Sequence, residues 1–200
     1  DLDETLAKSG CRNYALWLIC RDLAKLSCSN NKEIFLRIIK IWQKESNPRR
    51  KYDWDFHIKK LANELGVKKS YNYESVIKKN LSKARLFPDA IPILKYFKSK
   101  GYKICIITNG LRKYQLPIIR KLKLLKYVSK VYTPHDGIIK PNVRIFRDHF
   151  DHKPIDLYID DQLYQGIYLG KKLKAKTFLI ARNYKGNINN YLKKKIKSEL

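Results

Sequence analysis

One stretch decides the fold of this 200-residue chain: LFPDAIPILKYFKSKGYKICIITNG, which spans Leu86–Gly110. Residues 89–100 place apolar side chains at helical spacing, and Gly101 is the kind of residue that ends a helix. The apolar run 102–107 then predicts a short strand, which closes on the polar group Thr108-Asn109-Gly110. A helix that leads into a buried strand with a polar carboxyl end is typical of a parallel α/β sheet.

The same alternation continues toward the C-terminal end of the chain. Apolar runs of strand length follow apolar patterns of helical spacing, which is the order expected of parallel βα units. The expected helices are 112–124 (with Pro117 as a kink or as the true start), 141–150 and 164–173, and the expected strands are 128–132, 155–159 and 177–180. We therefore predict an α/β fold with a Rossmann-like parallel sheet as its core.

An all-helical block precedes this α/β region. Helical periodicity is found over residues 10–28, 32–45, 53–65 (ended by Gly66) and 72–83. The run Asn47-Pro48-Arg49-Arg50 breaks the pattern between the second and third of these helices. We expect two domains: a core of residues 1–7 and 85–200, and a helical insertion of residues 8–84.

The chemistry-bearing residues lie where strands end. The chain opens on Asp1-Leu2-Asp3-Glu4-Thr5, and the strand 155–159 runs directly into Asp160 and Asp161. In parallel sheets the carboxyl ends of the strands form the ligand-binding edge. Two carboxylates two residues apart can supply an attacking nucleophile and a nearby acid that later returns as a base. This pairing favours covalent transfer of a charged group.

The opening motif lacks the apolar strand that should deliver it. The sequence contains no Met, and nothing apolar precedes Asp1. We therefore expect the first strand of the sheet to be missing from the N-terminal end, together with any targeting segment that preceded it.

The composition limits the kinds of partner. The net charge of +26 draws anions toward the protein, but Lys, Ile, Asn and Tyr are all abundant, so a biased composition explains the charge more simply than dedicated nucleic-acid binding. No apolar run approaches the ~20 residues of a membrane span. The four cysteines form no CxxC motif and lie near no histidine at zinc-ligand spacing, which favours reduced thiols and a cytoplasmic protein.

Four segments in order, DLDET, IITNG, IIKP and YIDD, resemble the motifs of the haloacid dehalogenase (HAD) superfamily. The similarity covers nearly the whole chain, including KPNVRIF and the tail GIYLGKKLKAKTFLI. A helical block between the first and second motifs is similar to the subgroup with a helical cap, which includes phosphoglycolate phosphatases and nucleotidases. The resemblance implies a magnesium-dependent phosphatase and disfavours dehalogenation, because dehalogenases typically lack an acid at the position of Asp3.

The resemblance also implies roles for individual residues. Asp1 matches the nucleophile and Asp3 the general acid and base, with the main-chain carbonyl of Asp3 facing the metal. Thr108 matches the hydroxyl that binds the phosphoryl group, with help from the backbone of Asn109. Lys140 matches the lysine that neutralises the nucleophile and the phosphate oxygens.

The resemblance assigns Mg²⁺ to Asp1, Asp3, Asp160 and Asp161, with Asp161 as a direct ligand and Asp160 as a second or water-mediated one. Oxygen ligands of this kind suit magnesium. Many relatives carry a pattern similar to GDSxxND here, whereas this chain has Gly166 where the last Asp is often found. That departure implies a weaker metal site or a slower reaction unless the acidic doublet compensates.

We expect hydrolysis of a small phosphorylated metabolite, with two alternatives: a phosphatase that acts on nucleic-acid ends, and a non-catalytic binding protein that keeps the fold.

The four histidines, His57, His135, His149 and His152, form no convincing metal set. The tryptophans Trp17, Trp42 and Trp54 all lie in the helical block, where packing is their expected role.

Overall fold

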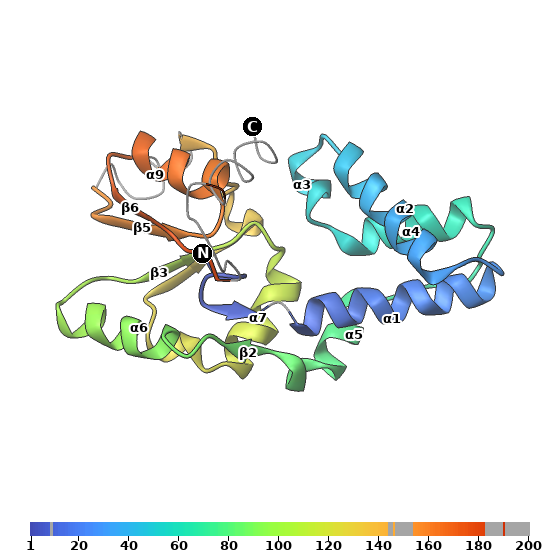
Figure 1. The fold of residues 1–200 in the computed structure, drawn as a ribbon, viewed down its shortest axis with the longest axis horizontal. Coiled ribbons are helices and arrows are strands. Elements are labelled where there is room, and N and C mark those ends of the chain that lie inside the picture. The colour runs from blue at the N-terminus through green and yellow to red at the C-terminus, as the bar shows by residue number, and fades with distance from the viewer. Residues whose placement is uncertain (9, 144–145, 147–153, 183–189, 191–200) are drawn as a thin grey trace. The chain divides into compact units, whose positions relative to one another are not determined.

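The computed structural model describes residues 1–8, 10–143, 146, 154–182 and 190. The chain divides into two compact units, a helical one of residues 9–85 and 110–126, and an α/β one of residues 1–8, 86–109 and 127–200 (Figure 1). The sequence-based boundaries, 8–84 against 1–7 with 85–200, differ from this division mainly at residues 110–126, which pack with the helices. Each unit is described by itself.

Over its described residues, the helical unit contains the four helices predicted before residue 84, the helix predicted at 112–124, and the short helix α3, which was not predicted. Its helices are α1 (Gly10–Leu26), α2 (Asn31–Lys44), α3 (Pro48–Lys51), α4 (Trp54–Glu64), α5 (Tyr73–Lys79) and α7 (Arg112–Lys121), with short 3-10 turns at Leu81–Lys83 and Leu124–Lys126. The break predicted at residues 47–50 is present, and α3 forms within it because proline is well tolerated in a first helical turn. The predicted helix 72–83 is divided into α5 and a 3-10 turn.

Polar caps and one glycine set the ends of these helices. The side chains of Asn30 and Asn72 accept hydrogen bonds from the backbone N–H groups of Lys32 and Ser75, which satisfies orphan donors at the starts of α2 and α5. Gly66 follows α4 with a φ of 68°, a conformation that glycine adopts without a steric penalty. The predicted role of Gly66 as a helix stop is therefore confirmed.

Tyr114 of helix α7 makes several of the contacts that join this helix to the helical unit. Tyr114 is buried, and its hydroxyl lies 2.8 Å from Asp53 Oδ1 and 2.9 Å from Asp55 Oδ2, so it donates to one of these carboxylates. The same hydroxyl accepts a hydrogen bond from the N–H of Asp55 at 3.1 Å. Pro117 lies inside α7 without ending it. These bonds explain why residues 110–126 belong with the helices.

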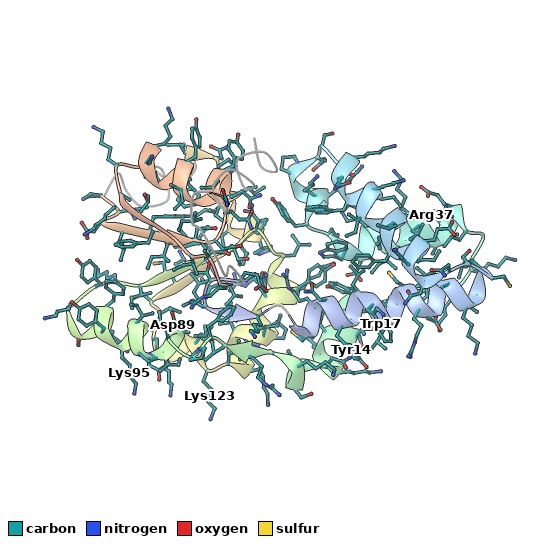
Figure 2. The ribbon with its side chains drawn as sticks, viewed as in Figure 1. Tyr14, Trp17, Arg37, Asp89, Lys95 and Lys123 are labelled. Atoms are coloured by element: carbon teal, nitrogen blue, oxygen red, sulfur yellow. The ribbon has the colours of Figure 1, made fainter. Side chains whose placement is uncertain are left out.

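Aromatic rings pack along the helices as expected. Trp42 and Trp54 stack with their centroids 6.3 Å apart, and Tyr14 and Trp17 stack at 5.7 Å on α1 (Figure 2). Trp17 stays 40% exposed, and the guanidinium of Arg21 covers its ring at 4.9 Å. The three tryptophans thus serve packing within this unit.

The α/β unit contains parallel strand pairs, which confirms the predicted fold class. Its elements are β1 (Ala7–Lys8), α6 (Ala90–Ser99), β3 (Cys105–Ile107), β4 (Lys130–Tyr132), β5 (Leu157–Asp160), a π-helix (Leu163–Tyr168), α9 (Leu169–Lys172) and β6 (Lys176–Leu179), and β1 pairs with β2 (Arg85–Leu86). Strands β3 and β4 are parallel, as are β5 and β6. Strands β3, β4 and β5 are shorter than the strands predicted at 102–107, 128–132 and 155–159, most clearly β3, whereas β6 has the predicted length and begins one residue earlier.

Two expected features lie largely outside the described residues. The helix predicted over 141–150 falls mostly on residues that the structure does not describe, as do His149 and His152.

Among the helices that are described, none has both the length and the apolar character needed to cross a membrane.

The core of the helical unit yields a stability prediction. Ile38 is fully buried in α2, whereas Leu36 on the same helix is 51% exposed. We expect Ile38→Ala to lower the free energy of unfolding by about 2–5 kcal/mol, because it removes buried methyl groups and leaves a cavity. Urea unfolding followed by circular dichroism measures this change.

Leu36→Ala is the matched control, and it should change the free energy of unfolding by less than about 1 kcal/mol. Equal losses in the two variants would contradict the packing described for α2.

Candidate active site

The N-terminal residue lies beside the end of β5. The main-chain nitrogen of Asp1 donates a hydrogen bond to the carbonyl of Ile159 at 2.9 Å, although the two residues are 158 positions apart. Asp160 and Asp161 follow directly, so the opening acid and the acidic doublet lie at one strand end. The grouping expected from the order of the motifs is present in the fold.

A buried lysine links these acids. Lys140 Nζ lies 2.9 Å from Asp1 Oδ1 and 2.7 Å from Asp160 Oδ2, and the lysine side chain is only 2% exposed. Burial opposes the charge on Lys140, but the charge and hydrogen bond of Asp160 together with the charges of Tyr158 and Asp161 outweigh burial and hold the lysine pKa above its ordinary value. Burial likewise opposes the charge on Asp160, and Lys140 reverses this effect, so the Asp160 pKa lies below its ordinary value. The Lys140 ammonium and the Asp160 carboxylate are therefore charged together.

Asn109 fixes the main chain that carries this lysine. Its Oδ1 accepts a hydrogen bond from the Lys140 N–H at 2.8 Å, and its Nδ2 donates to the Lys140 carbonyl at 3.1 Å. The same Nδ2 also donates to Gln165 Oε1 at 3.0 Å. The side chain of Asn109 thus orients Lys140, a structural contact that differs from the phosphate contact expected of its backbone.

The three acids form a site whose charge suits a divalent cation. Carboxylate oxygens of Asp1, Asp160 and Asp161 all lie within 4.8 Å of one another. Two such charges repel by about 3 kcal/mol at an effective dielectric constant of about 20. Lys140 offsets one of the three charges, so a cation with hard oxygen preferences fits this donor set.

The remaining predicted residues, Thr108 and Asp3, make main-chain contacts. Thr108 is buried, and its N–H donates to the Tyr132 carbonyl at 3.0 Å, which continues the pairing of β3 with β4. The main chain of Asp3 forms an isolated parallel β-bridge with that of Ala7. The turn between them contains Glu4, whose φ is 56°. The contacts described above bring together Asp1, Asn109, Lys140, Asp160 and Asp161.

Sequence reasoning missed two glutamines at this site. Gln162 donates from its N–H to Asp160 Oδ1 at 2.9 Å and from Nε2 to Asp161 Oδ2 at 2.8 Å. Gln165 accepts the bond from Asn109 described above. The only sequence signal was their position directly after the acidic doublet, in a segment that forms a π-helix, a conformation frequent at functional sites.

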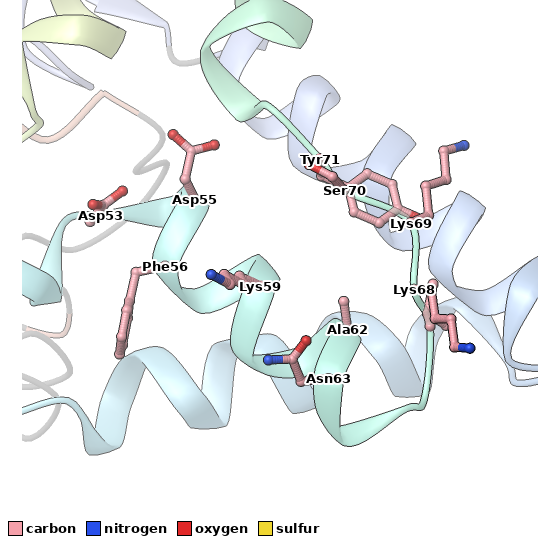
Figure 3. Close-up of a pocket in the computed structure, with 11 residues that line it drawn as sticks. Asp53, Asp55, Phe56, Lys59, Ala62, Asn63, Lys68, Lys69, Ser70 and Tyr71 are labelled. Carbon is pink, nitrogen blue, oxygen red and sulfur yellow. The ribbon is translucent and has the colours of Figure 1, made fainter.

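A separate pocket lies within the helical unit. It has a volume of about 470 Å³, and its walls come from α4 and from the segment 67–71 (Figure 3). Its lining mixes acids and lysines: Asp53, Asp55, Phe56, Lys59, Ala62, Asn63, Val67, Lys68, Lys69, Ser70 and Tyr71. Lys113 binds both Asp53 and Asp55, at 3.2 and 2.8 Å, so these acids already have a counter-ion. None of the predicted catalytic residues lines this pocket.

Comparison with known proteins places the chain in a family. Residues 18–180 match the sequence model described as haloacid dehalogenase-like hydrolase, which is more than half of the chain. The chain belongs to this family. The resemblance drawn from the four motifs is thereby confirmed.

Solved structures share the fold at low sequence identity. A HAD phosphatase from Thermococcus onnurineus is similar with a TM-score of 0.75 and 23% identity, over 100% of this chain and 96% of that one. The putative HAD-hydrolase YfnB from Bacillus subtilis, in a structure bound to magnesium, has a TM-score of 0.66 and 18% identity, over 92% of this chain and 88% of that one. These similarities support the fold.

A curated relative is the glyceraldehyde 3-phosphate phosphatase of Methanothermobacter thermautotrophicus. It is 35% identical over 65 residues, which is 32% of this chain. The match spans 29% of the length of that relative.

The Lys140–Asp160 pair predicts a pH dependence of stability. Because the folded-state pKa of Asp160 is lowered from 3.8, its contribution is present above that value and is lost as pH falls through the lower folded pKa. With a chelator present, Asp160→Asn should cost about 3–5 kcal/mol of unfolding free energy near neutral pH, since it leaves a buried charge poorly paired. Urea titrations from about pH 7 to about pH 3 measure the difference between the two proteins.

The difference between wild type and variant should shrink only at the acidic end of this series. A difference that stays constant, or that grows as pH falls, would contradict the charged pair.

Proposed function

We propose that this protein is a Mg²⁺-dependent phosphatase that hydrolyses a small phosphomonoester through an aspartyl-phosphate intermediate. The observation that carries the proposal is the buried ammonium of Lys140 between Asp1 and Asp160, beside a third acid. Membership of a hydrolase family and the phosphatase name of a curated relative support it.

Asp1 and Asp161 are the proposed carboxylate ligands of the cation, and the main-chain carbonyl of Asp3 is the proposed third ligand from the protein. Asp160 lies within reach of the same site, but each of its oxygens already accepts a hydrogen bond from the protein. When bound, the cation would neutralise charge on the phosphoryl oxygens and align the substrate. The structure of YfnB bound to magnesium lends support from a protein of the same fold.

Asp1 is the proposed nucleophile. Lys140 binds its Oδ1, which orients the carboxylate and leaves Oδ2 to attack phosphorus as the bond to the leaving oxygen breaks. Asp3 gives its proton to the leaving oxygen, and then takes a proton from the water that hydrolyses the aspartyl phosphate. Lys140 and the hydroxyl of Thr108 stabilise charge on the transferring group, which is the main requirement of phosphoryl transfer.

The substrate is proposed only as a class, a small phosphorylated metabolite, and the helical segment 8–84 as the cap that selects it. A cytoplasmic location is also proposed, because the described cysteines, Cys11, Cys20, Cys28 and Cys105, are free thiols.

Replacing the two opening acids tests the reaction. With Mg²⁺ and p-nitrophenyl phosphate, Asp1→Asn should abolish turnover because the nucleophile is lost, and Asp3→Asn should lower kcat by about 100- to 10,000-fold because the general acid is lost. Removal of Mg²⁺ by a chelator should stop turnover of the wild type. Absorbance of the released nitrophenolate measures each rate.

Glu33→Gln is the matched control, since Glu33 is an exposed acid on α2. Its rate should equal that of the wild type. A folded wild-type protein with no turnover would sink the proposal, and would favour a non-catalytic binding role.

The net charge of +26 supports one second candidate, a phosphatase that acts on nucleic-acid ends. The two candidates differ in their response to salt. For a small substrate we expect KM to change less than about 10-fold between about 50 and 200 mM NaCl, whereas a protein with several phosphate contacts loses about 1,000- to 100,000-fold in affinity over that range.

Steady-state kinetics on p-nitrophenyl phosphate and on a 5′-phosphorylated oligonucleotide give both dependences. A steep salt response together with preference for the oligonucleotide would replace the small-molecule assignment.

A further inference from the structure

Positions 160 and 166 compete for one side-chain volume. Asp160 is fully buried at the end of β5, and Gly166 lies in the π-helix that packs on this strand. A Cβ atom added at Gly166 would lie 2.6 Å from Asp160 Cγ and 3.0 Å from Asp160 Oδ1, and closer still to Asp160 Cβ. Real Cβ atoms do not approach other atoms this closely, so only one of the two positions can carry a side chain.

The close approach of helix and strand explains this competition. Gly170 is four residues beyond Gly166, so both glycines lie on one face of the helical segment. A Cβ atom at Gly170 would lie 3.1 Å from the Cβ of Tyr158, which is two residues before Asp160 on the same face of β5. Two glycines thus bring the helical backbone against two neighbouring side chains of the strand.

The space that a side chain at position 166 would need is occupied by the Asp160 carboxylate, and both oxygens of this carboxylate accept hydrogen bonds from the protein. Asp160 Oδ2 accepts from Lys140 Nζ at 2.7 Å, and Oδ1 accepts from the Gln162 N–H at 2.9 Å. Asp160 therefore binds the same ammonium that Asp1 Oδ1 binds at 2.9 Å.

We propose that Asp160 is the positioning residue for Lys140, and that positions 160 and 166 are a reciprocal pair. One carboxylate, carried by either position but not by both, is needed to hold the lysine. In this proposal the Asp160 side chain leaves room only for glycine at position 166, so Gly166 does not weaken the metal site. The catalytic part of this inference rests on the proposed phosphatase function, whereas the packing part stands without it.

Four proteins test the pair: wild type, Asp160→Gly, Gly166→Asp, and the double variant. Each single variant should melt at least about 5 °C lower than wild type, the first because Lys140 loses its partner and the second because two side chains meet in one space. The double variant should recover most of that loss. Thermal unfolding with a chelator present gives these values without any assay of activity.

Turnover of p-nitrophenyl phosphate tests positioning in the same four proteins. Each single variant should lose about 100-fold or more in kcat, with a smaller change in KM, and the double variant should return to within about 10-fold of wild type. Asp160→Gly combined with Gly166→Asn is the matched control, because asparagine fills the same volume without charge. This control relieves the clash between the two side chains but does not restore the charge partner of Lys140, so it should recover less of both the melting temperature and kcat than the double variant does.

Two results would overturn the inference. Losses in melting temperature that add in the double variant would show that the two positions do not share a volume. A double variant that is stable but as slow as the single ones, or a control as fast as the double variant, would show that the carboxylate does not position Lys140. A wild type without turnover would count against the proposed function alone, because the melting temperatures still decide the packing.

Discussion

The α/β unit depends on one buried ammonium. Lys140 is almost inaccessible, and its two carboxylate partners, Asp1 and Asp160, are far apart in the chain. A buried charge without a partner costs several kcal/mol, so neither acid can be lost from a stable fold at low cost. This electrostatic constraint ties the N-terminal residue to the end of β5, and it also places the chemistry there.

The surrounding structure serves to hold that charge in place. Asn109 binds both main-chain polar groups of Lys140, and Gln162 binds both acids of the doublet. Such contacts fix the direction of the lysine and carboxylate side chains before any substrate arrives, which is the preorganisation that phosphoryl transfer requires. The shared volume of Asp160 and Gly166 extends the same constraint to packing.

Much of the fold was predictable from local patterns. Periodicity identified α1, α2, α4 and α6, and Gly66 and Gly101 both adopt positive φ angles after the helices that they end. Local patterns did not predict which distant parts of the chain a helix packs against. Of the two roles expected for Pro117, the start of a helix is wrong, because Pro117 lies within α7. The hydroxyl of Tyr114 attaches that helix to Asp53 and Asp55, about 60 residues earlier in the chain, which no local pattern indicates.

The sequence by itself determined the chemical groups and the strand ends at which they lie, because residue type and hydrophobic period are local properties. It also determined the family, since the order of four motifs is a property of the chain alone. Only the tertiary structure decided that Asp160 faces Lys140, that Asn109 holds the lysine backbone, and that Gly166 makes room for a carboxylate. Those outcomes depend on distances between residues far apart in the chain, and packing sets such distances only when the whole unit has folded.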